Sequence, residues 1–111
     1  MDRETRRVLE TRARFLKALS HPTRLFLVEQ LRGGARCVCE LTDGVGADVS
    51  TVSRHLALLK HAGIVDAEKR GQKVFYWLRA PCVLGFFSCI DDVLRGEACV
   101  DEPCACPTST P

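Results

Sequence analysis

Residues 49–63, VSTVSRHLALLKHAG, constrain the fold of this chain most, because they combine a helical apolar spacing with a polar front end. Val52, Leu56 and Leu59 follow each other at i, i+4 and i+7, which places them along one side of a helix. Ala62-Gly63 and the β-branched pair after it end the helix. The stretch therefore predicts a short helix with one side packed on a core.

The N-terminal end of this helix is rich in hydrogen-bonding side chains. Asp48 precedes it and is expected to cap it through its carboxylate. The polar residues on the helix itself are Ser50, Thr51, Ser53, Arg54 and His55. Such a helix can insert its N-terminal end into the major groove of DNA. A surface helix whose polar residues meet only water is the alternative, and this stretch alone does not choose between the two.

Charge is distributed unevenly along the chain, although its formal net value is only +2. Residues 1–36 contain 9 Lys/Arg against 4 Asp/Glu, and residues 50–79 contain 6 against 2. Residues 91–106 contain 1 basic against 5 acidic side chains. The basic charge thus lies on the first predicted helix and around the helix predicted for residues 49–63. This distribution favours a polyanion as partner over a merely solvated surface.

The remaining pattern predicts a mainly α fold with a small β-hairpin: about five helices and a two-stranded wing. Glycines at 44 and 46, between the third helix and residues 49–63, give a helix-turn-helix. The other predicted helices cover residues 3–19, 23–32, a short stretch opened by Cys37, and 82–95; the predicted strands cover 64–68 and 74–78. His21, beside a proline, is expected to start the second helix rather than to bind a metal.

The predicted hairpin has a basic tip that contains glycine. Its cations are Lys69, Arg70 and Lys73. A wing of this kind can lie along DNA phosphates, whereas on its own a charged hairpin loop is equally well a solvated turn.

The last predicted helix is too apolar for a small monomer to cover. Phe86, Cys89 and Val93 share one side of it. We therefore expect it to pair with the first helix and with its mate in a homodimer. Residues 1–95 would form the winged helix-turn-helix DNA-binding and dimerisation domain, and residues 96–111 a flexible, acidic, cysteine-containing tail.

The order of these elements and several motifs resemble the ArsR/SmtB family of metal-responsive winged-helix repressors, most of all its arsenic-responsive members. The similar segments are LKALSHPTRL (16–25), CVCEL (37–41), TVSRHLALLKHAGIV (51–65) and GQKVFYWL (71–78). The resemblance spans roughly residues 8–94. It implies a homodimer that holds double-stranded operator DNA and releases it when an inducer binds.

The sequence departs from the family pattern at three places. His21 stands where an acidic residue is usual. Thr42 occupies the place of a third cysteine found in many arsenic-responsive members, so a three-thiolate site within that helix is in doubt. The histidine and carboxylate pairs that some members use for zinc on the last helix are absent, which argues against a zinc sensor of that type.

Cys37 and Cys39 are the predicted metal ligands, because two nearby thiolates favour soft, thiophilic ions. Trivalent arsenic or antimony, as arsenite or antimonite, is the expected inducer, with cadmium or lead as alternatives. Two buried, merely apolar cysteines are the competing interpretation. Residues i and i+2 of a regular helix point about 200° apart, so we expect ion capture to unwind the start of the third helix.

Five further cysteines have less certain roles. Cys82 and Cys89 are expected to pack in the core. Cys99, Cys104 and Cys106 lie in the tail, where they could complete the Cys37/Cys39 site, bind a separate soft ion or do neither.

A thiol-redox switch, or a minor enzyme on the same fold, is the hypothesis from a different class. The sequence contains no catalytic motif, so we expect neither catalysis nor a required cofactor. It contains no apolar run of membrane-spanning length and no hydrophobic signal core, so we expect a cytoplasmic protein without a membrane partner.

Overall fold

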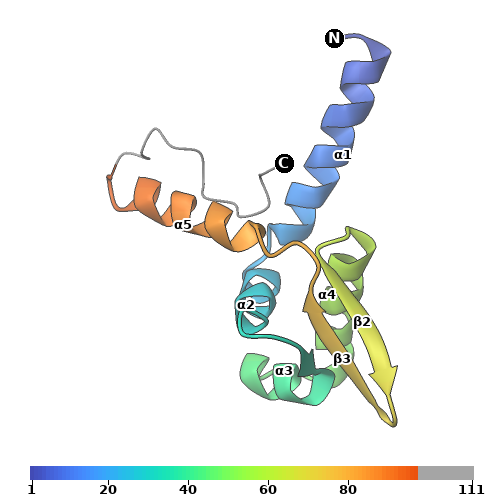
Figure 1. Cartoon of the computed structure of the whole chain (residues 1–111). Helices are drawn as coiled ribbons and strands as arrows, with labels where there is room; N and C mark the ends of the chain where they lie inside the picture. Colours follow the sequence, from blue (N-terminus) through green and yellow to red (C-terminus); the bar gives the residue numbers. More distant parts are fainter. Residues whose placement is uncertain (98–111) are drawn as a thin grey trace. The chain divides into compact units, whose positions relative to one another are not determined.

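The computed structural model describes residues 1–97, which form five helices and one three-stranded antiparallel sheet (Figure 1). In chain order these elements are α1 (Arg3–Leu19), α2 (Pro22–Gln30), β1 (Arg36–Cys37), α3 (Val38–Val45), α4 (Val49–His61), β2 (Val65–Arg70), β3 (Lys73–Leu78) and α5 (Val83–Leu94). The chain divides into two compact units, of which the first is Met1–Arg79 and the second begins at Ala80. The predicted winged helix-turn-helix is confirmed.

The core of the first unit lies between α2, α3, α4 and the start of the hairpin. Its side chains, each no more than 2 % exposed, are Leu27, Val28, Leu31, Leu41, Val52, Leu56, Leu59, Ile64 and Val65. The predicted inner side of α4 is therefore confirmed. α2 buries Leu27 and Val28, and Leu31 is buried just after it, whereas Leu25 is 38 % exposed.

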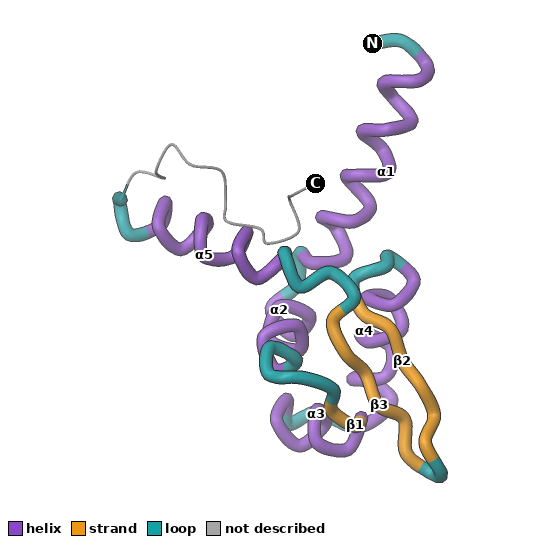
Figure 2. The backbone as a smooth tube through the Cα atoms, viewed as in Figure 1, coloured by secondary structure: helices purple, strands orange, loops and turns teal. Residues whose placement is uncertain are grey.

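The sheet has one strand more than the sequence predicts. β3 pairs with β2 from Val65↔Leu78 to Arg70↔Lys73, and its other edge pairs with β1 through Arg36↔Tyr76 and Cys37↔Phe75 (Figure 2). A two-residue strand is too short for the alternation by which strands are recognised in a sequence. This short strand matters because it joins the hairpin to the start of α3.

α1 has the predicted bounds. Asp2 caps its N-terminus, because its carboxylate accepts a hydrogen bond of 2.7 Å from the Thr5 N–H. Leu19 is its only buried residue. Leu9 and Leu16, two turns apart, are 42 % and 50 % exposed. These apolar side chains of α1 are therefore uncovered within the described single chain, as the expected pairing of this helix in a dimer requires.

α5 begins at Val83, one residue after the predicted start. It exposes four large apolar side chains: Phe86, Ile90, Val93 and Leu94. Among the described residues, no helix combines the length and apolar character needed to cross a membrane. The predicted tail cysteines, Cys99, Cys104 and Cys106, lie outside the described residues.

Candidate nucleic-acid interface and thiol pair

The predicted polar residues in the N-terminal half of α4 differ in their exposure to solvent. Ser50, Ser53 and Arg54 are exposed, and Thr51 is half-buried. Because Val52 and Leu56 anchor the opposite side of the helix in the core, the exposed group has a fixed orientation. An anchored helix end with an exposed arginine has the geometry required to read base edges in a major groove.

Asp48 occupies the N-cap position of α4, but its carboxylate does not cap the backbone as predicted. It accepts hydrogen bonds from the hydroxyls of Ser50, at 2.5 Å, and of Thr51. These bonds, that of Ser50 first, lower the pKa of Asp48 below its ordinary value. The carboxylate therefore holds both hydroxyl hydrogens, and the two hydroxyl oxygens remain as acceptors for a donor on DNA.

His55, predicted with the DNA-contacting group, lies against α2. Its Nδ1 is 3.3 Å from Arg24 Nη1, and its ring centroid is 4.5 Å from that of His21. Arginine can only donate, so Nδ1 must accept and the imidazole is neutral with its proton on Nε2. Burial lowers the pKa of His55, and the nearby His21, Arg24 and Arg54 lower it further.

Acidification should therefore destabilise the fold through His55. The ordinary pKa is 6.5 and the folded value lies below it, so the unfolded chain binds the proton first as the pH falls. The contribution of His55 is fully present above 6.5 and is lost below it. We expect thermal unfolding at about pH 5.5 to occur at a lower temperature than at about pH 7.5.

The melting temperature of the variant His55→Gln should fall less between about pH 7.5 and about pH 5.5 than that of the wild type, because glutamine accepts the Arg24 hydrogen bond without titrating. His61→Gln, at an exposed histidine of the same helix, is the matched control and should behave like the wild type. An equal pH dependence in wild type and His55→Gln would contradict the assignment.

His21 is the N-cap of α2, as predicted. Its Nδ1 accepts a hydrogen bond of 3.1 Å from the Thr23 N–H, so histidine here replaces the usual acidic cap. Sequence reasoning missed Arg24, whose Nε also donates to the Ala18 carbonyl at 2.7 Å. The only signal for it was its place in the segment LKALSHPTRL. Arg24 thus connects the end of α1 with α4.

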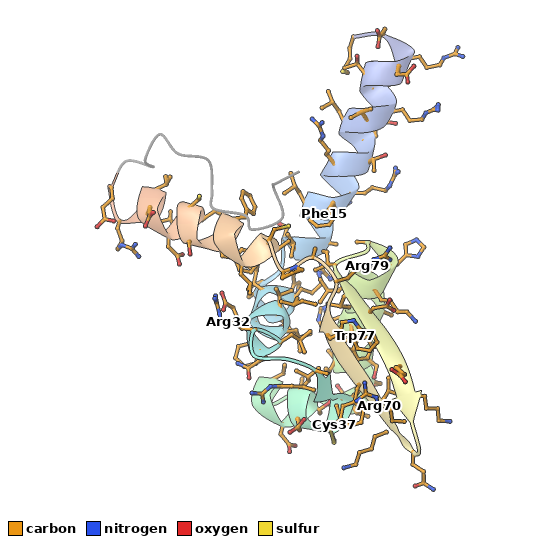
Figure 3. All side chains as sticks on the ribbon, viewed as in Figure 1. Phe15, Arg32, Cys37, Arg70, Trp77 and Arg79 are labelled. Atoms are coloured by element: carbon orange, nitrogen blue, oxygen red, sulfur yellow. A yellow bond between two sulfur atoms is a disulfide. The ribbon has the colours of Figure 1, made fainter. Side chains whose placement is uncertain are left out.

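The hairpin tip carries its three predicted cations in exposed positions. Arg70 and Lys73 pair across the strands, so their side chains share one side of the hairpin, while Lys69 points to the other. The Arg70 guanidinium lies 5.1 Å from the Phe75 ring centroid and 3.4 Å from a Glu68 oxygen. Figure 3 labels Arg70 on the hairpin. The tip extends beyond α3 (Figure 1), which leaves it accessible to a phosphate backbone.

Cys37 and Cys39, the predicted metal ligands, lie together where β1 meets α3. Their Cα atoms are 5.4 Å apart and their sulfurs are joined as a disulfide. Cys37 is 3 % exposed, whereas Cys39 is exposed. Reduction of the disulfide gives two thiols at one place, one inside the fold and one at its surface.

The prediction that ion capture must unwind the third helix rests on a wrong premise. Cys37 is not in the helix: it is the N-cap of α3, with extended angles of φ −81° and ψ 159°, and its N–H donates to the Glu40 carboxylate at 3.1 Å. One extended residue turns its side chain toward that of Cys39. The two sulfurs therefore meet while Val38 onward stays helical.

No third ligand from the described residues completes this site. Nowhere within residues 1–97 do three His, Cys, Asp or Glu side chains gather as a metal site would need. Thr42 follows Cys39 by one helical turn, and its hydroxyl is buried without a hydrogen-bond partner. A third donor would have to come from elsewhere, such as water or residues outside the described part.

The two cysteines near α5 differ in their surroundings. Cys89 lies half-buried on α5, in keeping with the predicted packing role. Cys82, predicted to pack in the core, is exposed at the N-cap position of the helix. Cys82 has helical backbone angles and stands four residues before Phe86, which is itself 42 % exposed, so the side that the two residues share is not a buried one.

Comparisons with known proteins agree with this architecture. Residues 21–67 match the model of the family described as bacterial regulatory proteins of the arsR family. An uncharacterized HTH-type transcriptional regulator of Methanocaldococcus jannaschii is 36 % identical over 85 residues, which are 76 % of this chain and 96 % of that protein. The HTH-type transcriptional repressor SmtB of Mycobacterium tuberculosis is 42 % identical over 73 residues.

That match covers 66 % of this chain and 54 % of SmtB, so the chain spans about half the length of that relative. Among solved structures, a homodimeric winged helix-turn-helix DNA-binding domain from Mycobacterium bovis, a possible ArsR-family regulator, superposes with a TM-score of 0.74. It is 27 % identical, and the superposition covers 86 % of this chain and 88 % of that one. With α3 and α4 as its helix-turn-helix and β2–β3 as its wing, the chain belongs to the arsR family of bacterial regulatory proteins.

Proposed function

We propose that this protein is a transcriptional repressor that binds operator DNA as a homodimer and releases it when trivalent arsenic or antimony binds Cys37 and Cys39. The observation that carries the inducer assignment is the meeting of the two sulfurs at the junction of β1 and α3. Family membership supports the DNA-binding part, and a regulator acting on operator DNA belongs in the cytoplasm.

Operator binding would use α4 and the hairpin together. Arg54 and Ser53 would contact base edges, with Ser50 and Thr51 accepting through their oxygens beside Asp48. Lys69, Arg70 and Lys73 would contact flanking phosphates, which position the protein without reading sequence. His55 would hold α4 in place from its protein-facing side, through its contact with Arg24 of α2.

Inducer binding would act on α3 and its junction with β1, because α3 packs against α4. The backbone of Cys37 pairs with Phe75 of β3 and also starts α3, and α3 in turn packs on α4. Two thiolates around one ion, together with a further ligand, need more room than the buried Cys37 side chain has. Ion binding would therefore favour a shifted junction, and an ion that binds the shifted form better weakens DNA binding.

A titration of the DNA-bound, reduced protein in gel shifts tests this function. Arsenite, cadmium and zinc are added in separate series, with lead as a further soft ion. We expect release by arsenite and no comparable release by zinc. Failure to bind its own promoter region at all would refute the repressor proposal, whereas binding without release by arsenite would refute only the inducer.

A redox-responsive regulator is the second candidate, because the two cysteines are joined as a disulfide. Its formation would take one proton from each thiol and two electrons from the pair, which reduce peroxide to two molecules of water. Release by peroxide, reversed by dithiothreitol, together with no response to arsenite, would favour this candidate.

Dimerisation should depend on the exposed apolar side of α5. Phe86 is 42 % exposed and stands with Ile90 and Val93 among uncovered apolar residues. Phe86→Asp would bury a charge in this seam, so we expect monomers and loss of operator binding. Sedimentation at micromolar concentration measures the assembly, with the exposed Ser88→Asp as a control on the same helix. A monomeric wild type would contradict the dimer.

A further inference from the structure

A second candidate binding site lies between α1 and α4, away from both the thiol pair and the hairpin. It is a hollow of about 590 Å³. Its apolar wall includes Phe15 and Ala18 of α1 and Leu58 of α4. Figure 3 labels Phe15 on the C-terminal half of α1. A volume of this size is in the range of sites for small organic molecules.

Apart from the Thr11 hydroxyl, the polar side chains that line this hollow are cationic or imidazole groups. Arg14 and Lys17 of α1, Arg24 of α2 and His61 of α4 contribute to the lining, and no acidic residue does. None of the three cations forms an ion pair with another residue of the described chain. An apolar wall with unneutralised cations at its edge matches a ligand that has an apolar body and one negative charge.

The hollow is also connected to the reading helix. Arg24 is held by the Ala18 carbonyl at 2.7 Å, and its Nη1 is 3.3 Å from Nδ1 of His55, which lies in the N-terminal half of α4. A carboxylate or sulfonate that binds this guanidinium through Nη1 competes with His55 for that nitrogen. Because Nδ1 of His55 would then lose its donor, occupancy of the hollow alters the support behind Arg54.

A second copy of the chain fits the hollow less well than a small molecule does. The residues of α1 that line it, from Thr11 to Ala18, lie on the side of the helix roughly opposite Leu9 and Leu16. Those two leucines and Val8 are the large exposed apolar residues of α1, and Val8 stands two turns before Phe15 on the same side. A dimer seam centred on Leu9 and Leu16 would therefore leave the hollow open.

We propose that this hollow binds a small organic anion with an aromatic or aliphatic body, and that its occupancy weakens operator binding through Arg24 and His55. The binding itself is independent of the proposed function. Its effect on DNA rests on that function, so the two are measured separately.

The binding test uses 8-anilinonaphthalene-1-sulfonate as an aromatic anion, titrated into the full reduced chain and followed by fluorescence. We expect one saturable site per protomer. Lys17→Glu and Arg14→Glu should each weaken binding by about tenfold or more, and Lys17→Gln by less. Arg12→Glu is the matched control, with the same charge change on the same helix outside the lining. Circular dichroism confirms that each variant is folded.

Four outcomes of the binding test would overturn the proposal. Wild-type binding by both Lys17→Glu and Arg14→Glu would refute the site. An equal loss of binding in Arg12→Glu would indicate an effect of overall charge. Binding of the neutral N-phenyl-1-naphthylamine as tight as that of the sulfonate would refute the anionic class. Binding that disappears as sedimentation shows the dimer forming would assign the hollow to a second copy.

The coupling test measures operator affinity by fluorescence anisotropy with and without the sulfonate. We expect weaker binding in the wild type and no change in Lys17→Glu. An unchanged affinity at saturating sulfonate would refute the coupling while leaving the site intact. If the protein bound no operator even without the sulfonate, the proposed function would fail, and the fluorescence titration would still decide the site.

Discussion

Replacing Cys37 or Cys39 by serine is expected to leave operator binding intact and to abolish release by arsenite. The two sulfurs form a pair within residues 1–97, so either substitution leaves a single one of these two thiolates at the junction of β1 and α3. Couplings between sites are typically about 1–3 kcal/mol, which would lower the operator affinity of the wild type roughly 5- to 150-fold when arsenite is bound. Anisotropy titrations under reducing conditions, with and without arsenite, measure this ratio directly.

Cys82→Ser and Cys89→Ser are the matched controls, because both remove a thiol from the described chain outside the pair. They should release DNA like the wild type. Joint replacement of Cys99, Cys104 and Cys106 tests whether the tail supplies a third ligand: a partial loss of arsenite affinity would show that it does. An unaltered arsenite response in both single variants at positions 37 and 39 would refute the site and leave the tail as the sensor.

Replacing Arg54 by alanine should give the second large effect, a loss of discrimination at one operator position. Arg54 is exposed beside the anchored side of α4, where a guanidinium can bind a guanine edge through two hydrogen bonds. The expected loss of binding free energy is about 1–3 kcal/mol. This loss should disappear for operators already mismatched at that position.

Lys73→Ala provides the contrast, because Lys73 is a predicted phosphate contact at the hairpin tip. This substitution should weaken binding to all DNA sequences alike, and it should reduce the slope of log affinity against log salt concentration by about one. Competition titrations with wild-type and single-mismatch operators at several salt concentrations separate the two patterns. Operator binding that is unchanged by Arg54→Ala would contradict the assignment of α4 as the reading helix.

The sequence determined the elements whose side chains repeat with a regular period. α1 has the predicted bounds, and the apolar spacing of α4 places Val52, Leu56 and Leu59 in the core as expected. A thirteen-residue helix carries enough periodic positions to fix its inner side without tertiary information. The motifs around it were specific enough to indicate the family, which the comparisons confirm.

Only the tertiary structure decided how two local groups are used. β1 is two residues long and exists because β3 offers it an unpaired edge, and this pairing takes Cys37 out of the helix and next to Cys39. His55 faces Arg24, 31 positions earlier in the chain. Periodicity reports which side of a helix is apolar, but contacts between distant segments decide which polar group meets which partner, and these contacts leave no local pattern in the sequence.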